Sequence, residues 1–123
     1  MRKFWPLLHR FWLLQVVFVL FPACSDVPSN PTWDDVEPIL LANCARCHTD
    51  PPILGALTNF RLDVYDDSIG QEGQTLVGAS TMAERIVVRI ADDTDPMPPA
   101  PARRLTERQR EILTTWWANG SPL

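Results

Sequence analysis

The sequence predicts an all-α fold, in which three or more short helices form one domain behind an N-terminal signal segment. Apolar residues recur at helical spacing in three stretches of the chain, and no stretch alternates between apolar and polar residues as a half-buried strand would. Prolines occur in the regions between these stretches, and proline disrupts both helix interiors and central strands. At 123 residues the chain is long enough for one compact domain and too short for two.

The first helix is predicted to begin near residue 34 or 35 and to end near Cys44. It opens on acidic residues, which suit the positive end of a helix dipole. Pro38 is compatible with this helix only if it falls in the first turn, where its missing N–H would have no partner anyway. Residues 56–79 show no sustained period, although residues 64–69 could form one or two helical turns.

The second and third helices are expected on either side of a proline-rich loop. Residues 80–91 carry apolar side chains at helical spacing, with arginines on another face. Residues 92–102 contain four prolines and should be an extended loop. Thr106 and Gln109 then form a capping box that begins the third helix. The apolar face of that helix, which should pack against its neighbours, carries Ile112, Leu113, Trp116 and Trp117.

Residues 1–23 are predicted to be a signal peptide, because a short basic region precedes an apolar run at residues 11–21. An uncleaved membrane anchor that starts near Trp5 is the alternative. Cys24 follows directly, and residues 24–31 form a polar tether. This arrangement resembles the lipobox of bacterial lipoproteins, in which the cysteine carries a lipid. A plain signal peptide followed by an incidental cysteine remains the other interpretation.

The charged residues are unevenly distributed along the chain. After residues 1–23 there are eight arginines, no lysine and fifteen acidic residues, a net charge of about −7. Such an acidic chain is not expected to bind nucleic acid. Asp92, Asp93 and Asp95 most simply belong to a solvated loop, although they could also favour a basic docking partner.

The segment Cys44-Ala45-Arg46-Cys47-His48 has the pattern for covalent haem attachment. Two thiols three residues apart can reach the two vinyl groups of one porphyrin edge, and the adjacent histidine can bind the iron. Arg46 could pair with a haem propionate, but simple exposure to solvent is the plainer interpretation.

A zinc site, a redox-active thiol pair and a structural disulfide compete with haem attachment at this segment. A zinc site needs four ligands, so a carboxylate or a partner chain would have to complete it. A thioredoxin-type pair belongs beside a strand at the head of a helix, and no strand is predicted before Cys44. A disulfide between Cys44 and Cys47 would close only a tight loop and would leave His48 without a role.

Two methionines are candidates for the sixth iron ligand. Met97 is preferred, because flanking prolines restrict its backbone and its loop could place the soft thioether against the haem. Met82 lies in an apolar helical stripe, where methionine is more often a core residue. A sixth position that is open, or occupied by water or another ligand, is the third possibility.

With these residues in place, residues 33–123 resemble the class I cytochrome c family, and more narrowly the small monohaem domains of bacterial exported proteins and lipoproteins. The resemblance rests on the helix that enters Cys-x-x-Cys-His, the Met97-Pro98-Pro99 loop and a closing helix with Trp117. It implies a cytochrome c domain at residues 32–123 around one covalently bound haem c, in which the first and last helices cross beside the haem. It also implies that His48 and Met97 are the axial ligands.

The function expected from this resemblance is transfer of single electrons between exported or membrane redox partners, without enzymatic activity of its own. Contact with those partners should be transient. The protein should lie on the periplasmic or cell-surface side, anchored through lipid on Cys24. Two alternatives remain: a catalytic or ligand-sensing haem subunit with an open sixth iron position, and a structural module held by a non-haem metal or by a disulfide.

Overall fold

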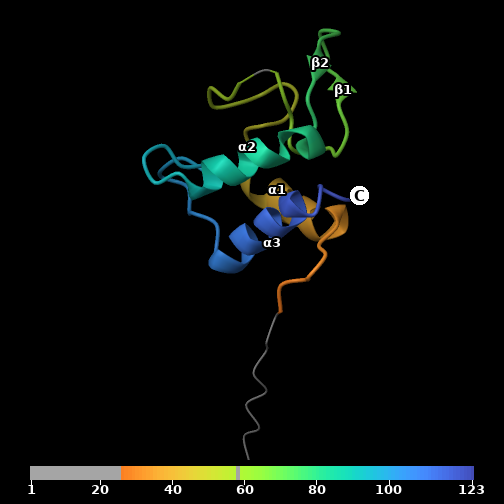
Figure 1. The fold of residues 1–123 in the computed structure, drawn as a ribbon. Helices are drawn as coiled ribbons and strands as arrows, with labels where there is room; N and C mark the ends of the chain where they lie inside the picture. The colour runs from red at the N-terminus through yellow and green to blue at the C-terminus, as the bar shows by residue number, and fades with distance from the viewer. Residues whose placement is uncertain (1–25, 58) are drawn as a thin grey trace, which may run out of the picture.

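A computed structural model describes residues 26–57 and 59–123 (Figure 1). The elements, in chain order, are α1 (Trp33–Asn43), β1 (Ser68–Ile69), β2 (Thr75–Leu76), α2 (Ala79–Ala91) and α3 (Glu107–Ala118). The prediction of a mostly helical domain with three short helices is confirmed. The predicted signal peptide and Cys24 lie outside the described residues. Within the described part of the chain, no helix is both long and apolar enough to cross a membrane.

Helix α1 begins slightly earlier than predicted, and its proline is therefore deeper in the helix. The backbone N–H of Thr32 donates to Asp35 Oδ2 at 3.0 Å, which fixes the start of the helix at Trp33. Pro38 consequently lies beyond the first turn, contrary to the expectation from the sequence. Pro38 has no N–H to donate to the carbonyl of Asp34, four residues earlier. Both residues are exposed, so water can bond to that carbonyl instead.

A small hairpin replaces the helical turns that the sequence left open for residues 64–69. Ser68 pairs with Leu76 and Ile69 pairs with Thr75 in an antiparallel register. The reversal depends on Gly73, whose φ of 79° lies in the left-handed region that glycine adopts without strain. Local propensity is weak in this segment, and pairing across the hairpin determines its conformation.

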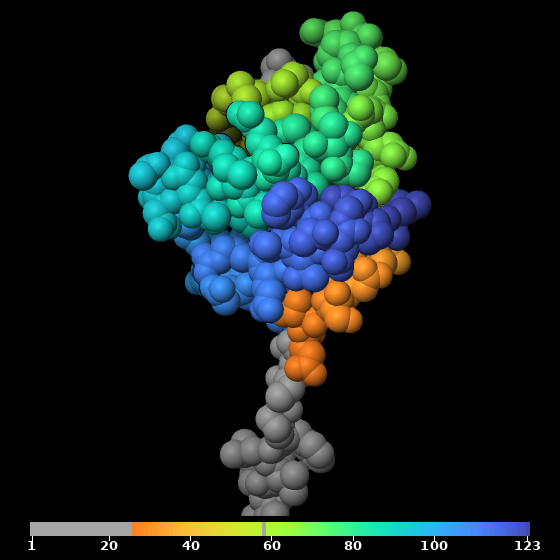
Figure 2. All heavy atoms as spheres, in the orientation of Figure 1, coloured from red at the N-terminus to blue at the C-terminus, as the bar shows by residue number. Residues whose placement is uncertain are grey.

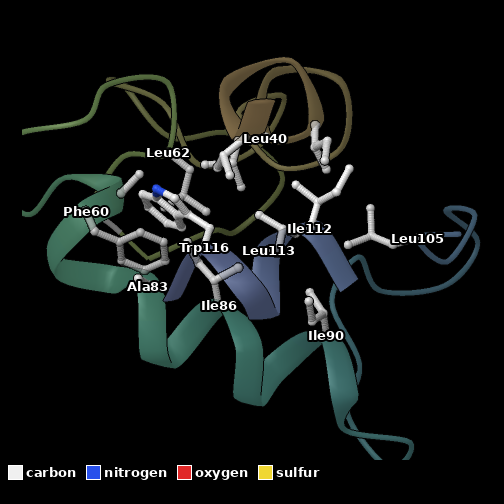
Figure 3. Close-up of a cluster of buried hydrophobic side chains, with 13 residues drawn as sticks. Leu40, Phe60, Leu62, Ala83, Ile86, Ile90, Leu105, Ile112, Leu113 and Trp116 are labelled. Atoms are coloured by element: carbon white, nitrogen blue, oxygen red, sulfur yellow. The ribbon is translucent and has the colours of Figure 1, made fainter. Parts of the chain in front are cut away.

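The hydrophobic core lies where α3 packs against both α1 and α2 (Figure 3). Trp116 and Leu113 of α3 are completely or almost completely buried, as is Leu40 of α1. Segment 60–62, which follows α1, adds Phe60 and Leu62 to the same cluster. Burial of this apolar surface is the main stabilising contribution to such a domain, at roughly 25 cal/mol per Å².

The two adjacent tryptophans of α3 have different environments. Trp116 is 1% exposed, whereas Trp117 is 40% exposed. The prediction that both pack in the core is therefore wrong for Trp117. A helix turns by about 100° per residue, so neighbouring side chains point in different directions and only one of the pair reaches the core.

The chain termini of the domain are tied to each other. The Pro122 carbonyl accepts hydrogen bonds from Trp33 N at 3.0 Å and from Trp116 Nε1 at 2.9 Å. Asn119 Nδ2 also donates to the carbonyl of Ser29 at 3.2 Å. Figure 2 shows the residues from 26 onward (orange) lying directly against the C-terminal segment (blue). The described end of the predicted tether thus lies against the domain.

Candidate functional site

The Cys-x-x-Cys-His segment forms a turn directly after α1. Cys44 is the residue that ends the helix, and its N–H donates to Leu40 O at 2.8 Å. The Cys44 carbonyl then accepts hydrogen bonds from the N–H groups of both Cys47 and His48, each at 3.0 Å. These bonds continue the helical winding for one further turn. The two thiols and the imidazole are therefore held in a compact turn anchored to a core helix.

A cavity of about 910 Å³ lies beside this turn. Its volume is near the upper end of the range for small-molecule and cofactor pockets, roughly 300–1,000 Å³. The loops that follow α1 and α2 both contribute to its wall, and Figure 1 shows these loops on the same side of the molecule. The residues that line this cavity include Cys44, Cys47, His48, Phe60, Leu62, Met82, Ile86, Ile90 and Met97.

His48 is held at three points of its structure. Its backbone N–H donates to the Cys44 carbonyl, and its own carbonyl accepts from Leu62 N at 2.8 Å. Its ring stacks on Phe60 with centroids 4.6 Å apart. Burial lowers the pKa of His48, which favours the neutral imidazole that binds a metal. Its Nδ1 atom is buried and has no hydrogen-bond partner among the described residues. An imidazole with a buried, unpaired nitrogen is compatible with ligation to iron.

Cys44 and Cys47 are free thiols, so no disulfide joins them. Burial raises the pKa of the Cys44 thiol to about 11, and the charge of Cys47 adds to this shift. Cys44 is consequently protonated at neutral pH. Within residues 26–57 and 59–123, no three histidine, cysteine or acidic side chains are grouped so that they could hold a metal ion. The zinc alternative therefore finds no supporting group of ligands in this part of the chain.

Both candidate methionines line the cavity. Met97 is partly buried in the loop after α2, and its N–H donates to Arg89 O at 3.1 Å. Pro98, which follows it, is buried. Met82 extends from α2 and packs against the hydrophobic core as well. The fold thus brings a thioether from the loop and another from the helix to the cavity that also contains His48.

Several wall residues were not identified from the sequence. Phe60 and Leu62 lie next to His48, and the exposed residues Leu54 and Leu57 lie at the wall formed by the preceding loop. The alternation of Phe60 and Leu62 with charged neighbours is a short period-2 signal that could have indicated an extended segment with one buried face. The loop residues carry no such local signal.

The charged residues of the wall are mainly arginines. Arg46, Arg85 and Arg89 line the cavity together with Asp95. Arg46 is exposed, as the plainer interpretation of the sequence expected. Arg89 donates to Asp95 Oδ2 at 2.7 Å. The cavity therefore has an apolar interior and a largely basic set of charged wall residues, which suits an apolar ring system that carries carboxylates.

Comparison of the chain with protein-family models, with curated proteins and with solved structures gives no match. The class of site is therefore defined by its own residues: two thiols, an imidazole and two thioethers around an apolar cavity in a mostly helical domain.

Proposed function

We propose that this protein is a monohaem c-type cytochrome that carries single electrons and is not itself an enzyme. The observation that supports this most strongly is the shared cavity: Cys44, Cys47, His48 and Met97 line one apolar space although Met97 is about fifty residues from the others in sequence. A chance Cys-x-x-Cys-His segment would have no reason to adjoin a cofactor-sized cavity with a thioether in its wall.

Each residue of the site has a specific role in this proposal. Cys44 and Cys47 would hold the haem through two thioether bonds, each made by addition of a thiol S–H across a vinyl group with no net oxidation or reduction. His48 would bind the iron through a ring nitrogen, and the stack on Phe60 together with the hydrogen bond from Leu62 N to the His48 carbonyl restricts the orientation of that ring. The bound haem supplies reversible one-electron chemistry at its iron.

Met97 is proposed as the sixth ligand in preference to Met82. Met82 packs against the core cluster, and this packing already accounts for an apolar side chain at its position. Met97 lies between prolines in a loop that is bonded to α2, so its thioether is presented to the cavity by a constrained backbone. A thioether ligand stabilises the reduced iron and raises the reduction potential.

The proposed setting is the periplasmic or cell-surface side of a bacterial membrane, with the domain anchored through lipid on Cys24. The acidic balance after residues 1–23 favours basic or mixed-charge redox partners over nucleic acid. Contacts between electron-transfer proteins are usually small, so binding to these partners should be brief and sensitive to salt.

Covalent haem is tested by expressing the full chain together with a cytochrome c maturation system. The expected product retains a haem stain on a denaturing gel, and its mass includes one haem. The variant Cys44→Ala/Cys47→Ala should lose the stain, whereas the matched variant Thr114→Ala, on α3, should keep it. An unstained wild-type band, or a mass without haem, would reject the proposal.

A further inference from the structure

Arg89, in the last turn of α2, is joined to the Met97 loop at two points. Its backbone carbonyl accepts the N–H of Met97 at 3.1 Å, and its guanidinium donates to Asp95 Oδ2 at 2.7 Å. The two loop residues are separated only by Pro96. Arg89 therefore binds both the backbone of Met97 and the side chain of Asp95.

The loop is folded so that Asp95 faces Arg89. Asp92 Oδ1 accepts hydrogen bonds from Thr94 N at 2.8 Å, from Thr94 Oγ1 at 2.7 Å and from Asp95 N at 3.2 Å. This turn reverses the chain directly after the helix. The segment is largely exposed to solvent, as the sequence suggested, and Asp92 and Asp95 also have hydrogen-bond partners within the molecule.

We propose that the Arg89–Asp95 ion pair is a positioning device for Met97, which keeps the thioether directed at the sixth iron position and disfavours its replacement by other ligands. This inference rests on the proposed function, in which Met97 is the sixth ligand. The Arg89–Asp95 pair would then influence replacement of the Met97 thioether by another ligand without itself contacting the iron.

The magnitude of the effect follows from the exposure of the pair. The side chain of Arg89 is 27% exposed and that of Asp95 is 72% exposed. Ion pairs with such access to solvent contribute little, and breaking one changes a local equilibrium by a factor of about two to five. A change of this size is too small to unfold the domain, but it is measurable as a change in ligand exchange.

Arg89 also lines the cavity, so a second role has to be separated from this one. It could bind a carboxylate of the haem directly. In that case loss of Arg89 would matter and loss of the Asp95 charge would matter far less. If instead the ion pair is what acts, either single change removes it completely and the second change adds nothing.

The experiment compares holoproteins of the wild type, Arg89→Gln, Asp95→Asn and the double variant. The matched controls are Arg110→Gln and Glu107→Gln, which break an exposed arginine–carboxylate pair on α3. Three quantities are measured: the affinity of the ferric protein for added imidazole, hydrogen exchange at the Met97 amide, and the unfolding midpoint.

We expect both single variants and the double variant to bind imidazole about two- to five-fold more tightly than the wild type, with faster exchange at the Met97 amide. The controls should match the wild type in both quantities. Equal affinity in all proteins would overturn the proposal, and so would an effect of Arg89→Gln that Asp95→Asn does not share. A wild type without covalent haem or without a methionine-ligated spectrum would instead reject the proposed function, before any variant is compared.

Discussion

The imidazole of His48 stacks on the ring of Phe60, with centroids 4.6 Å apart and an angle of 23° between the planes. Phe60 is also a member of the core cluster that joins α1, α2 and α3. The proposed iron ligand is therefore oriented by a residue whose own position is determined by core packing. Such support restricts the ring more firmly than a loop contact would.

Replacing Phe60 by leucine should remove this stack while the core remains apolar. We expect the free energy of unfolding of the holoprotein to fall by about 1–2 kcal/mol, because shape and aromatic contact are lost but burial is retained. Covalent haem should persist, because it depends on Cys44 and Cys47. The measurement is denaturant unfolding combined with the NMR signals of the His48 ring.

The control for this change is Ile112→Val, which trims a buried residue of α3 and should cost about 0.5–1.5 kcal/mol. It should leave the His48 signals nearly unchanged. If both variants shift those signals equally, general loosening of the core accounts for the effect and the stack has no special part in orienting the ring.

Met97→Ala should open the sixth iron position without releasing the haem. The reduced variant is expected to bind carbon monoxide readily, and its low-spin His/Met spectrum should disappear, because no thioether remains in the loop. Met82→Leu is the matched change. It keeps an apolar side chain of similar volume, should cost less than about 1.5 kcal/mol, and should retain the wild-type spectrum. The reverse pattern would assign the sixth ligand to Met82, and an unchanged spectrum in both would indicate a different ligand.

The helices were largely predictable because their signals are local. Residues 80–91 carry a clear helical period, and α2 spans Ala79–Ala91. The capping box is present as expected: Gln109 N donates to Thr106 Oγ1 at 3.2 Å, and Thr106 N donates to Gln109 Oε1 at 2.9 Å. The start of α1 is less predictable, because a proline beyond the first turn is tolerated where its face of the helix is exposed, and this exposure depends on tertiary packing.

The cavity wall could be predicted only in part. Cys44, Cys47 and His48 are adjacent in sequence, so their proximity needs no tertiary information. Phe60 approaches His48 because segment 60–62 bonds to the backbone of His48 and to Val77, contacts that no local pattern encodes. The pairing of Arg89 with Asp95 likewise depends on how the chain reverses after α2.

The two tryptophans of α3 should differ in their importance for stability. Trp116→Ala is expected to lower the free energy of unfolding by about 3–5 kcal/mol, because it empties a buried site and removes the hydrogen bond from Nε1 to Pro122 O. Trp117→Ala removes a partly exposed side chain and should cost about 1 kcal/mol or less. Denaturant unfolding of the two holoproteins measures this difference. Equal losses would mean that Trp117 is covered in the haem-loaded protein or contacts the haem itself.

The acid stability of the domain should depend on Asp63. Arg61 Nε donates to Asp63 Oδ1 at 2.7 Å, and this side-chain hydrogen bonding holds the pKa of the Asp63 carboxyl below its usual value of 3.8. The unfolded chain therefore takes up this proton at a higher pH than the folded chain does. The stabilisation is fully present above the unfolded pKa and is lost as the pH falls through the lower folded pKa.

The difference in free energy of unfolding between the wild type and Asp63→Asn should accordingly shrink as the solution is acidified. We expect the variant to be less stable at about pH 6 and the difference to shrink toward about pH 3, because only the wild type loses a charged partner of Arg61. Asp66→Asn, a change at a nearby exposed carboxylate, should run parallel to the wild type over the same range. A constant difference between Asp63→Asn and the wild type at every pH would show that the Arg61–Asp63 pair does not contribute through its charge. The segment beside His48 would then be held by its backbone bonds and by Phe60 alone.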